Sequence, residues 1–299
     1  MGIVDLLRQI PDIHFQENEK LSLKTSLGVG GEARYYVQPE SVNGLIRCAN
    51  AANVCGVPFK TIGNGTNLLV SDKGYDGLIA CTKNLNGLLL DKGEIIALCG
   101  TPLLRFVNFV SGSGRTGAEG LAGIPATVGG AICNNAGAFG FCVSDYISEV
   151  TLLNQGEIVR LKKVQCGFGY RQSAFSNFGI YEGATVISAK FRFPRRKIRH
   201  KSGADYYAIR KLTQPSGRTC GSVFKNPHGG YAGRLIEDAG LKNFRVRGAY
   251  VSDVHANFII TEENATATDV YTLIREIKRR VYDKFGVTLK EEVEYLGEF

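Results

Sequence analysis

The pattern of apolar and polar positions predicts four helices along the chain. The clearest begins at Thr268 and ends before Gly286, because glycine commonly follows the last turn of a helix. Its apolar residues at helical spacing are Val270, Leu273, Ile274, Ile277, Val281 and Phe285. The other predicted helices cover 42–56, 103–112 and 231–241. The first has one apolar face, formed by Val42, Leu45, Ile46 and Ala49. The second has Thr101 as its N-cap and an apolar stripe of Leu103, Leu104, Phe106, Val107 and Val110.

Short apolar runs bounded by turn residues predict strands elsewhere. These strands end at 35–39, flank a turn at 63–67, and cover 147–154, 157–163 and 183–193. The runs 85–91 and 94–100 are separated by Lys92-Gly93, which predicts a hairpin. Residues 118–145 are rich in small residues and are expected to form loops. Because strands and helices interleave without a regular βαβ alternation, we expect an α+β fold with mixed sheets.

Composition indicates a folded protein of two domains. The chain has 299 residues, of which 44% are hydrophobic and 21% are charged. A domain boundary is expected at the basic run 193–201. The chain lacks a signal-like start and a long apolar run, so we expect a cytoplasmic protein without a membrane anchor. Eight cysteines without a CxxC pair and only four histidines predict buried, reduced thiols and no metal site.

The formal charge of +8 predicts an anionic partner, which at this stage includes nucleic acid, a membrane surface and a phosphorylated small molecule. The charge is not evenly spread. Residues 195–247 hold 13 Lys plus Arg against 3 Asp plus Glu, a net +10 that leaves −2 for the remainder. The concentration in one segment favours a compact anionic ligand.

Two glycine-rich motifs can be interpreted either as ligand-binding loops or as ordinary turns. GSGRTG at 112–117 matches GxGxxG, but a predicted helix precedes it, so a helix stop is the better interpretation. GNGTN at 63–67 fits either a plain hairpin turn or an anion-binding turn with side-chain donors from Thr66 and Asn67. The small residues at 120–140 favour ligand binding, since their backbone N–H groups can line a flat cofactor.

Seven segments carry a family resemblance across nearly the whole chain. They are TSLGVGGEARYYVQP (25–39), GNGTNLLVSD (63–72), GIPATVGGAICNNAGAFG (123–140), FGYRQSAF (168–175), CGSVFKNP (220–227), VSDVHANFII (251–260) and LKEEVEYLG (289–297). In this order they resemble the UDP-N-acetylenolpyruvoylglucosamine reductase family, flavoenzymes of peptidoglycan synthesis, in the shorter form that lacks an extra tyrosine-bearing loop.

The resemblance implies the domain plan and the reaction. It implies a two-lobed FAD-binding domain of the vanillyl-alcohol oxidase type at 1–194, with lobes at about 1–80 and 81–194. An α+β substrate-binding domain at 195–299 would follow, its C-terminal strand returning toward the flavin. It further implies non-covalent FAD, NADPH as reductant, and reduction of UDP-N-acetylglucosamine enolpyruvate to UDP-N-acetylmuramate, a step that serves cell wall biogenesis, cell shape and cell division. We expect a monomer without a nucleic-acid partner.

The resemblance also implies the site residues. The catalytic positions are Arg171, Ser222 and Glu292. The cofactor-binding positions are Ile62, Gly63, Asn64, Gly65, Thr66, Asn67, Leu68, Gly123, Ile124, Pro125, Thr127, Val128, Gly129, Gly130, Asn135, Ala136 and Gly137. The substrate-binding positions are Tyr170, Arg210, Gln214, Lys225 and Asn226. His255 and Asn257 are interpreted as core polar groups and left outside the catalytic set.

These residue types suit the reduction of an enol ether conjugated to a carboxylate. Arg171 offers a permanent cation for the charge that develops on the carboxylate, and Ser222 offers a proton to the neighbouring carbon. Glu292 is expected beside the substrate carboxyl, either as a hydrogen-bonding acid or as a partner that polarises Arg171. Taken singly, the three would more often be a surface ion-pair partner, a turn residue and a solvated strand residue.

Three positions depart from the family pattern. Ala126 replaces the usual glycine, Asn134 the usual methionine, and Phe139 a common tyrosine. Ala126 requires a backbone φ outside the left-handed region.

Two other functions were considered. One is an alcohol or lactone oxidase on the same flavin scaffold, against which Arg171, Ser222 and Glu292 together argue. The other is a nucleic-acid binder, suggested by the basic run 195–201 but unsupported by any recognised binding motif.

Overall fold

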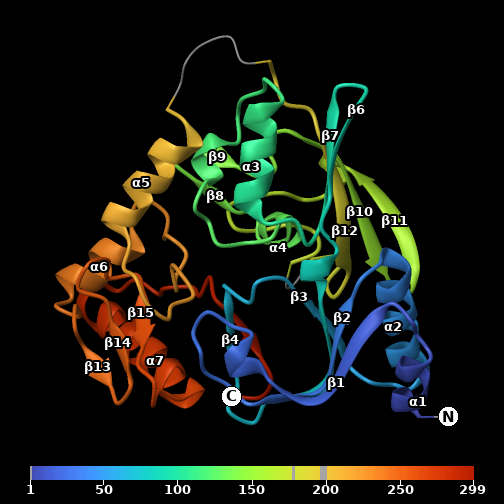
Figure 1. The fold of residues 1–299 in the computed structure, drawn as a ribbon. Coiled ribbons are helices and arrows are strands. Elements are labelled where there is room, and N and C mark those ends of the chain that lie inside the picture. The colour runs from blue at the N-terminus through green and yellow to red at the C-terminus, as the bar shows by residue number, and fades with distance from the viewer. Residues whose placement is uncertain (1, 177–178, 196–200) are drawn as a thin grey trace. The chain divides into compact units, whose positions relative to one another are not determined.

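The protein is described here by a computed structural model that covers residues 2–176, 179–195 and 201–299 (Figure 1). The chain forms two compact units, each built from three segments. Unit 1 comprises 1–17, 35–64 and 77–209, and unit 2 comprises 18–34, 65–76 and 210–299. This grouping differs from the continuous domains 1–194 and 195–299, whose functional division stays a prediction. The basic run that marked that boundary lies partly outside the described residues, at 196–200.

A five-stranded antiparallel sheet forms the centre of unit 1. Its strands, in spatial order, are β11 (Glu157–Lys162), β10 (Ile147–Asn154), β12 (Thr185–Phe191), β7 (Glu94–Leu98) and β6 (Leu88–Asp91). The predicted hairpin is confirmed, because Asp91 pairs with Glu94 across Lys92 and Gly93. Both turn residues have positive φ, 45° and 88°, as a tight two-residue hairpin turn requires.

Helices α3 (Leu103–Gly112) and α4 (Val128–Cys133) lie with this sheet, since α4 contacts β7 and β12 and α3 contacts α4. Helix α2 (Val42–Val54) instead contacts β3 (Phe59–Ile62) and α1 (Ile3–Arg8). Helix α3 buries its apolar face partly through Phe106, whose ring centroid lies 4.7 Å from that of Phe191 on β12. The stripe was predicted correctly apart from Leu104, which is 42% exposed.

The N-cap predicted for α3 is wrong. Pro102 occupies that position, while the Thr101 hydroxyl donates to the carbonyl of Gly87 at 3.1 Å and accepts from its N–H at 3.0 Å. The helix stop predicted at GSGRTG is confirmed. Helix α3 ends at Gly112, and Gly114 follows with a φ of 71°.

A four-stranded sheet has the order β1 (Ile13–Lys20), β2 (Glu32–Pro39), β5 (Tyr75–Cys81) and β3 (Phe59–Ile62). Strands β3 and β5 are parallel, with Ile62 opposite Cys81. Strands β1, β2 and β5 and helix α5 (Gly203–Thr213) each contain a division point between the units.

Unit 2 is built around its longest helix, α7 (Ala267–Phe285). Thr266 and Asp269 form a capping box at its start, and Gly286 ends it with a φ of 67°. Helix α7 packs with α6 (Ala232–Asp238) and a sheet of β13 (Arg245–Val246), β14 (Ala249–Val251) and β15 (Ile259–Thr261). A parallel pair, β4 (Leu68–Val70) with β16 (Glu294–Leu296), joins two distant parts of the chain.

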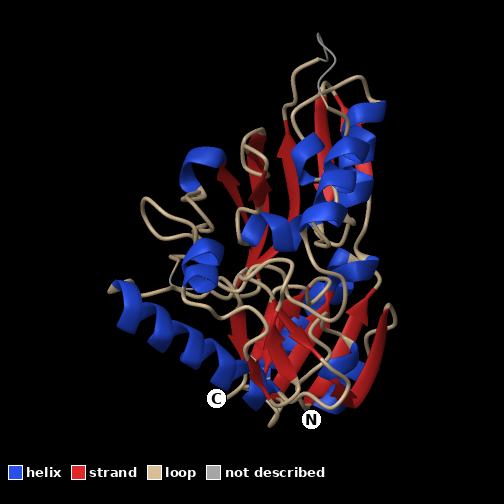
Figure 2. Ribbon diagram, turned by 90° about the vertical axis from the view of Figure 1, so that its left-hand side faces the viewer, coloured by secondary structure: helices blue, strands red, loops and turns tan. Residues whose placement is uncertain are grey.

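Helices and strands are both abundant, as the α+β prediction requires (Figure 2). Residues 118–145, expected to be loop, contain α4 and the small hairpin of β8 (Gly137–Ala138) and β9 (Phe141–Cys142). Short 3-10 turns complete the structure at Leu21–Leu23, Thr82–Asn84, Glu119–Leu121 and Lys163–Gln165.

Five of the eight cysteines are buried, and the other three are partly buried. Cys81 and Cys99 are buried, as their apolar runs predicted. Burial raises the pKa of the Cys99 thiol to about 12, which keeps it protonated and unreactive.

None of the described helices combines the length and apolar character needed to cross a membrane. Within the described ranges, no cluster of three or more His, Cys, Asp or Glu side chains could hold a metal ion.

Candidate active site

In unit 1, the loop after β3 lies against the loop before α4. Asn64 donates from Nδ2 to the carbonyl of Pro125 at 3.0 Å. A Cβ at Gly63 would lie 2.4 Å from Oγ1 of Thr127, so only glycine allows this approach. Ile62 is buried, and its carbonyl accepts from the Thr82 hydroxyl at 3.2 Å. Two predicted cofactor-binding segments, 61 residues apart, therefore meet.

The loop at 123–130 is fixed by backbone hydrogen bonds. Gly123 has a φ of 80°, whereas the φ of Ala126 is not positive. The family departure at Ala126 is therefore accommodated without strain. Thr127 caps α4 by accepting from the N–H of Gly130 at 3.3 Å, and the N–H groups of Val128 and Gly129 donate to the carbonyls of Thr101 and Cys99, both at 2.8 Å.

Arg171 is anchored to the segment that follows α4. Its Nη2 donates to the carbonyl of Gly137 at 2.8 Å, and its Nη1 donates to that of Asn135 at 3.4 Å. Nδ2 of Asn135 in turn donates to the carbonyl of Gly169 at 2.8 Å. Arg171 and Asn135 both have positive φ, 51° and 42°. Non-glycine residues seldom adopt this conformation, which is held where the surroundings enforce it, often at functional sites.

Two further predicted residues, Tyr170 and Ala136, lie in the same segments as Arg171 and Asn135. The guanidinium carbon of Arg171 lies 5.5 Å from the ring centroid of Tyr170, a side chain that is 58% exposed. Ala136 donates from its N–H to the carbonyl of Ala131 at 2.7 Å. The other two departures lie nearby, with Asn134 as the C-cap of α4 and Phe139 at a φ of 53°.

These loops fit a flavin. Asn135 is buried, and its Oδ1 has no hydrogen-bond partner among the described residues, so an acceptor is available for a bound group. Gly63 packs tightly against the Thr127 side chain and Gly123 has a positive φ, so both positions of these loops favour glycine. An acceptor left unpaired in a buried position is costly unless a ligand or water completes it.

The second half of GNGTN belongs to unit 2. A Cβ at Gly65, where φ is 64°, would lie 2.3 Å from the carbonyl oxygen of Lys24. The Asn67 side chain donates from Nδ2 to the carbonyl of Glu292 at 3.0 Å. The backbone carbonyl of Asn67 accepts from the N–H of Glu294 at 2.9 Å. Leu68 then begins β4 opposite Glu294, while Thr66 is half-buried between these contacts. GNGTN is not a hairpin turn, because β3 pairs with β5 and β4 pairs with β16.

Ser222 and Glu292 lie on neighbouring backbone segments of unit 2. The N–H of Glu292 donates to the carbonyl of Val223 at 2.7 Å, directly after Ser222. The N–H of Lys225 donates to the carbonyl of Lys290 at 2.9 Å, which extends the same pairing. Burial is the main cause that raises the pKa of the nearby Cys220 thiol to about 12, and the negative charge of Glu292 adds to it.

The predicted substrate-binding residues of unit 2 fall in two places. On α5, Nη1 of Arg210 donates to Oε1 of Gln214 at 3.2 Å. Beyond Lys225, the Oδ1 of Asn226 accepts from the N–H of Ala232 at 3.0 Å, so this side chain also fixes the start of α6. The structure brings Arg171 together with Asn135 and Gly137 in unit 1, and Asn67 and Ser222 together with Glu292 in unit 2.

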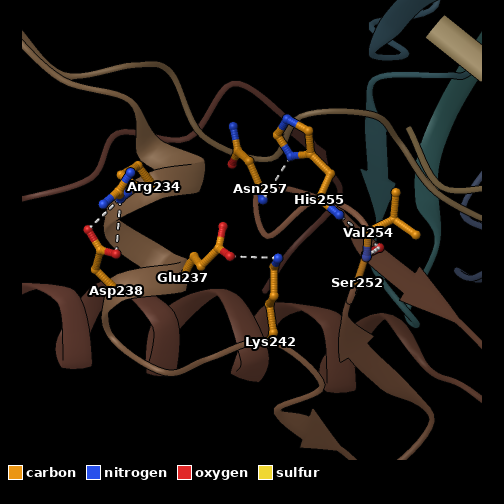
Figure 3. Close-up of polar contacts among 8 residues, drawn as sticks. All are labelled: Arg234, Glu237, Asp238, Lys242, Ser252, Val254, His255 and Asn257. Atoms are coloured by element: carbon orange, nitrogen blue, oxygen red, sulfur yellow. Dashed lines mark hydrogen bonds and ion pairs between the residues drawn. The ribbon is translucent and has the colours of Figure 1, made fainter. Parts of the chain in front are cut away.

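Asn257 has a larger structural role than its sequence context indicates. This buried side chain hydrogen-bonds both backbone groups of Phe224, two residues from Ser222. Figure 3 shows Asn257 with His255, whose Nδ1 accepts from the Asn257 N–H at 3.2 Å. The only signal in the sequence was the HANF segment itself, because a polar residue inside an apolar run requires partners.

Comparison with known proteins agrees with this geometry. A family model described as the C-terminal domain of UDP-N-acetylenolpyruvoylglucosamine reductase matches residues 213–296, and an FAD binding domain model matches residues 33–162. The UDP-N-acetylenolpyruvoylglucosamine reductase of Prochlorococcus marinus is 40% identical over 291 residues, covering 95% of this chain and 99% of that protein. The chain belongs to the UDP-N-acetylenolpyruvoylglucosamine reductase family.

Other members of the reductase family agree. The Thermotoga petrophila reductase is 40% identical over 281 residues, covering 92% of this chain and 96% of that protein. The crystal structure of the Thermus caldophilus enzyme superimposes with a TM-score of 0.77 at 32% identity, covering 95% of this chain and 99% of that one. The predicted fold class and the prediction of an FAD-dependent oxidoreductase are confirmed. The predicted boundary at 194/195 falls between the two matched models and stays a prediction.

Proposed function

We propose that this chain reduces UDP-N-acetylglucosamine enolpyruvate to UDP-N-acetylmuramate with NADPH, through non-covalently bound FAD, in the synthesis of peptidoglycan precursors. The observation that carries the proposal is the backbone pairing that sets Ser222 beside Glu292 and ties both to the GNGTN loop through Asn67. Family membership supplies the reaction, and this pairing gives the proposed acid and carboxylate a common support.

Ser222 is the proposed proton donor. When bound, the flavin supplies hydride to the distal carbon of the enol ether. The carbon next to the carboxylate then becomes strongly basic, and a serine hydroxyl held in contact with it can give up its proton. A hydroxyl also adds no charge that would disturb the enolate-like substrate.

Arg171 is the proposed group that stabilises the enolate-like charge. Its guanidinium is fixed by the carbonyls of Asn135 and Gly137, so it is oriented before substrate arrives. Glu292 acts beside the substrate carboxyl. Tyr170, Arg210, Gln214, Lys225 and Asn226 are proposed to bind the diphosphate or the carboxylate, in keeping with the +10 carried by residues 195–247.

Rapid mixing of the flavin-loaded protein tests the proposed reaction. NADPH should bleach the flavin absorbance, and the enolpyruvyl sugar nucleotide should restore it with formation of UDP-N-acetylmuramate. Reduction by an alcohol donor without reoxidation by the enolpyruvyl compound would instead assign the chain to the alternative oxidase function. We further propose that the protein works in the cytoplasm as a monomer.

A further inference from the structure

We propose that Asn257 is a positioning residue that holds Ser222 in place for proton transfer. The inference rests on the proposed role of Ser222 as the proton donor, and it assigns a function to a side chain first interpreted as a core polar group. Asn257 is 4% exposed and acts on the backbone that carries Ser222.

Asn257 fixes the residues after Ser222 from one side. Its Oδ1 accepts from the N–H of Phe224 at 3.0 Å, and its Nδ2 donates to the carbonyl of Phe224 at 2.8 Å. Its own carbonyl accepts from the N–H of Val223 at 2.8 Å, and the next residue, Phe258, forms a β-bridge with Ser222. Three consecutive residues are therefore held by one turn.

That turn is braced independently of Ser222. The Ser252 hydroxyl accepts from the N–H groups of Val254 and His255, at 3.1 and 3.3 Å, and Nδ1 of His255 accepts from the N–H of Asn257 (Figure 3). The N–H of Phe258 donates to the carbonyl of His255 at 2.9 Å. Asn257 is thus held by hydrogen bonds within its own turn as well as by those to the segment that it positions.

The opposite side of the segment is held by the stretch that carries Glu292, just before β16. The carbonyl of Val223 accepts from the N–H of Glu292, and Phe224 forms a bridge with Glu291. Gly221, directly before Ser222, has a φ of 80°, so the chain enters the segment through a turn. Because the hydroxyl must contact one substrate carbon, loosening either side would lower the fraction of molecules in the reactive geometry.

Only a neutral amide satisfies both groups of Phe224. Leucine would leave a buried N–H and a buried carbonyl without partners. An ionised aspartate would still accept from the N–H but would place a carboxylate oxygen against the carbonyl. A protonated aspartate restores the donor, which provides a signature in pH.

The test compares the two half-reactions in Asn257→Leu and Asn257→Asp. Flavin reduction by NADPH should stay within about twofold of the parent, while reoxidation by the enolpyruvyl sugar nucleotide should slow on the order of 10- to 100-fold. The Asn257→Asp variant should recover reoxidation, relative to the parent at each pH, as the pH falls toward the ordinary range of aspartate. If Asn257→Leu does not fold, Asn257→Asp carries the test, since it keeps the acceptor for Phe224.

The matched control is Asp269→Ala, which removes another buried side chain of unit 2, whose carboxylate accepts from the N–H of Thr266 at the start of α7. It should lose stability but keep both half-reactions. Two results would overturn the inference. One is that the Asn257 variants and Asp269→Ala all slow reduction and reoxidation to the same extent. The other is normal reoxidation in a folded Asn257→Asp variant.

A double variant separates the inference from the proposed function. If Ser222 is the proton donor, Asn257→Asp should slow reoxidation no further in a Ser222→Ala background. Normal reoxidation by Ser222→Ala alone would refute the proposed function at Ser222. Slow reoxidation by Ser222→Ala together with normal reoxidation by Asn257→Asp would refute only the positioning role.

Discussion

Asn67 and Glu292 are joined by a hydrogen bond of 3.0 Å across 225 positions of sequence. The donor is the Asn67 side chain, and the acceptor is the backbone carbonyl of the residue proposed to act beside the substrate carboxyl. One side chain of the GNGTN loop therefore supports a catalytic candidate near the other end of the chain.

The substitution Asn67→Ala should weaken this support. Loss of the hydrogen bond should lower the free energy of unfolding by about 1 kcal/mol and slow flavin reoxidation by substrate more than reduction by NADPH. Urea unfolding and rapid mixing measure the two effects. Asn86→Ala is the control, because the exposed Asn86 side chain hydrogen-bonds the carbonyls of Lys83 and Asn84 and the Arg105 guanidinium and none of these groups contacts Glu292, so the preference for slower reoxidation should be absent. Equal behaviour of the two variants would deny Asn67 its supporting role.

The substitution Ser222→Ala should divide the catalytic cycle. NADPH should still reduce the flavin, since no proton from Ser222 is needed for that step, but substrate should oxidise it very slowly. Absorbance of the flavin followed after rapid mixing reports both steps. The companion variant Ser202→Ala removes a hydroxyl whose hydrogen bonds among the described residues are with Asp205, and both steps should stay normal. An unchanged second step in Ser222→Ala contradicts the proton-donor role.

The close approach at Gly63 makes it sensitive to a single methyl group. In Gly63→Ala the new Cβ would lie 2.4 Å from the Thr127 hydroxyl, which is itself held as the cap of α4. We expect a loss of about 1–3 kcal/mol in unfolding free energy and a lower ratio of flavin to protein after purification.

Gly112→Ala is the matched control for Gly63→Ala. Apart from its own stretch of helix, no described residue lies within 4 Å of its added Cβ, and the residue is helical, so stability should rise by about 0.5–1 kcal/mol. Full flavin content in Gly63→Ala would show that these loops do not hold the cofactor.

The stability of the protein should depend on pH through His255. Burial is the main cause that lowers the His255 pKa from its ordinary 6.5, and nearby Lys242 adds to the effect while Glu237 opposes it. The folded state then binds the proton less readily than the unfolded state. His255 therefore contributes stability that is complete above pH 6.5 and is lost as the pH falls through the lowered pKa.

The His255→Asn variant isolates this contribution, because asparagine keeps an acceptor for the Asn257 N–H without titrating. Urea unfolding from about pH 8 to about pH 5 should show that the parent loses more stability than the variant on acidification. Parallel stability curves would contradict the lowered pKa.

Local patterns predicted much of the fold. Helix α7 was recognisable because its apolar repeat from Val270 to Phe285 ends before Gly286, and the β6–β7 hairpin because Lys92-Gly93 fits a tight turn. Helix α5 was missed because it has no buried residues and hence no strong apolar stripe. Strand β1 was missed for a similar reason, since half or more of its residues are exposed.

The site was predicted through motifs, and its geometry could not be. The pairing of β4 with β16 and the contact of Asn64 with Pro125 join residues that no local period connects. Thr101 shows the converse error, because a residue with good capping chemistry was used instead to bind Gly87. Asn257 was undervalued since a buried amide and a positioning amide look alike until their partners are known.

The β4–β16 pair also sets an order of events in synthesis of the chain. Strand β4 leaves the ribosome early, but its partner spans Glu294–Leu296, so unit 2 cannot be completed until translation has passed residue 296. Closing so long a loop carries an entropic cost that must be met before the pairing can stabilise the structure. Until then the nascent chain holds β4 without its partner strand, so unit 2 completes its folding only after nearly the whole chain has been made.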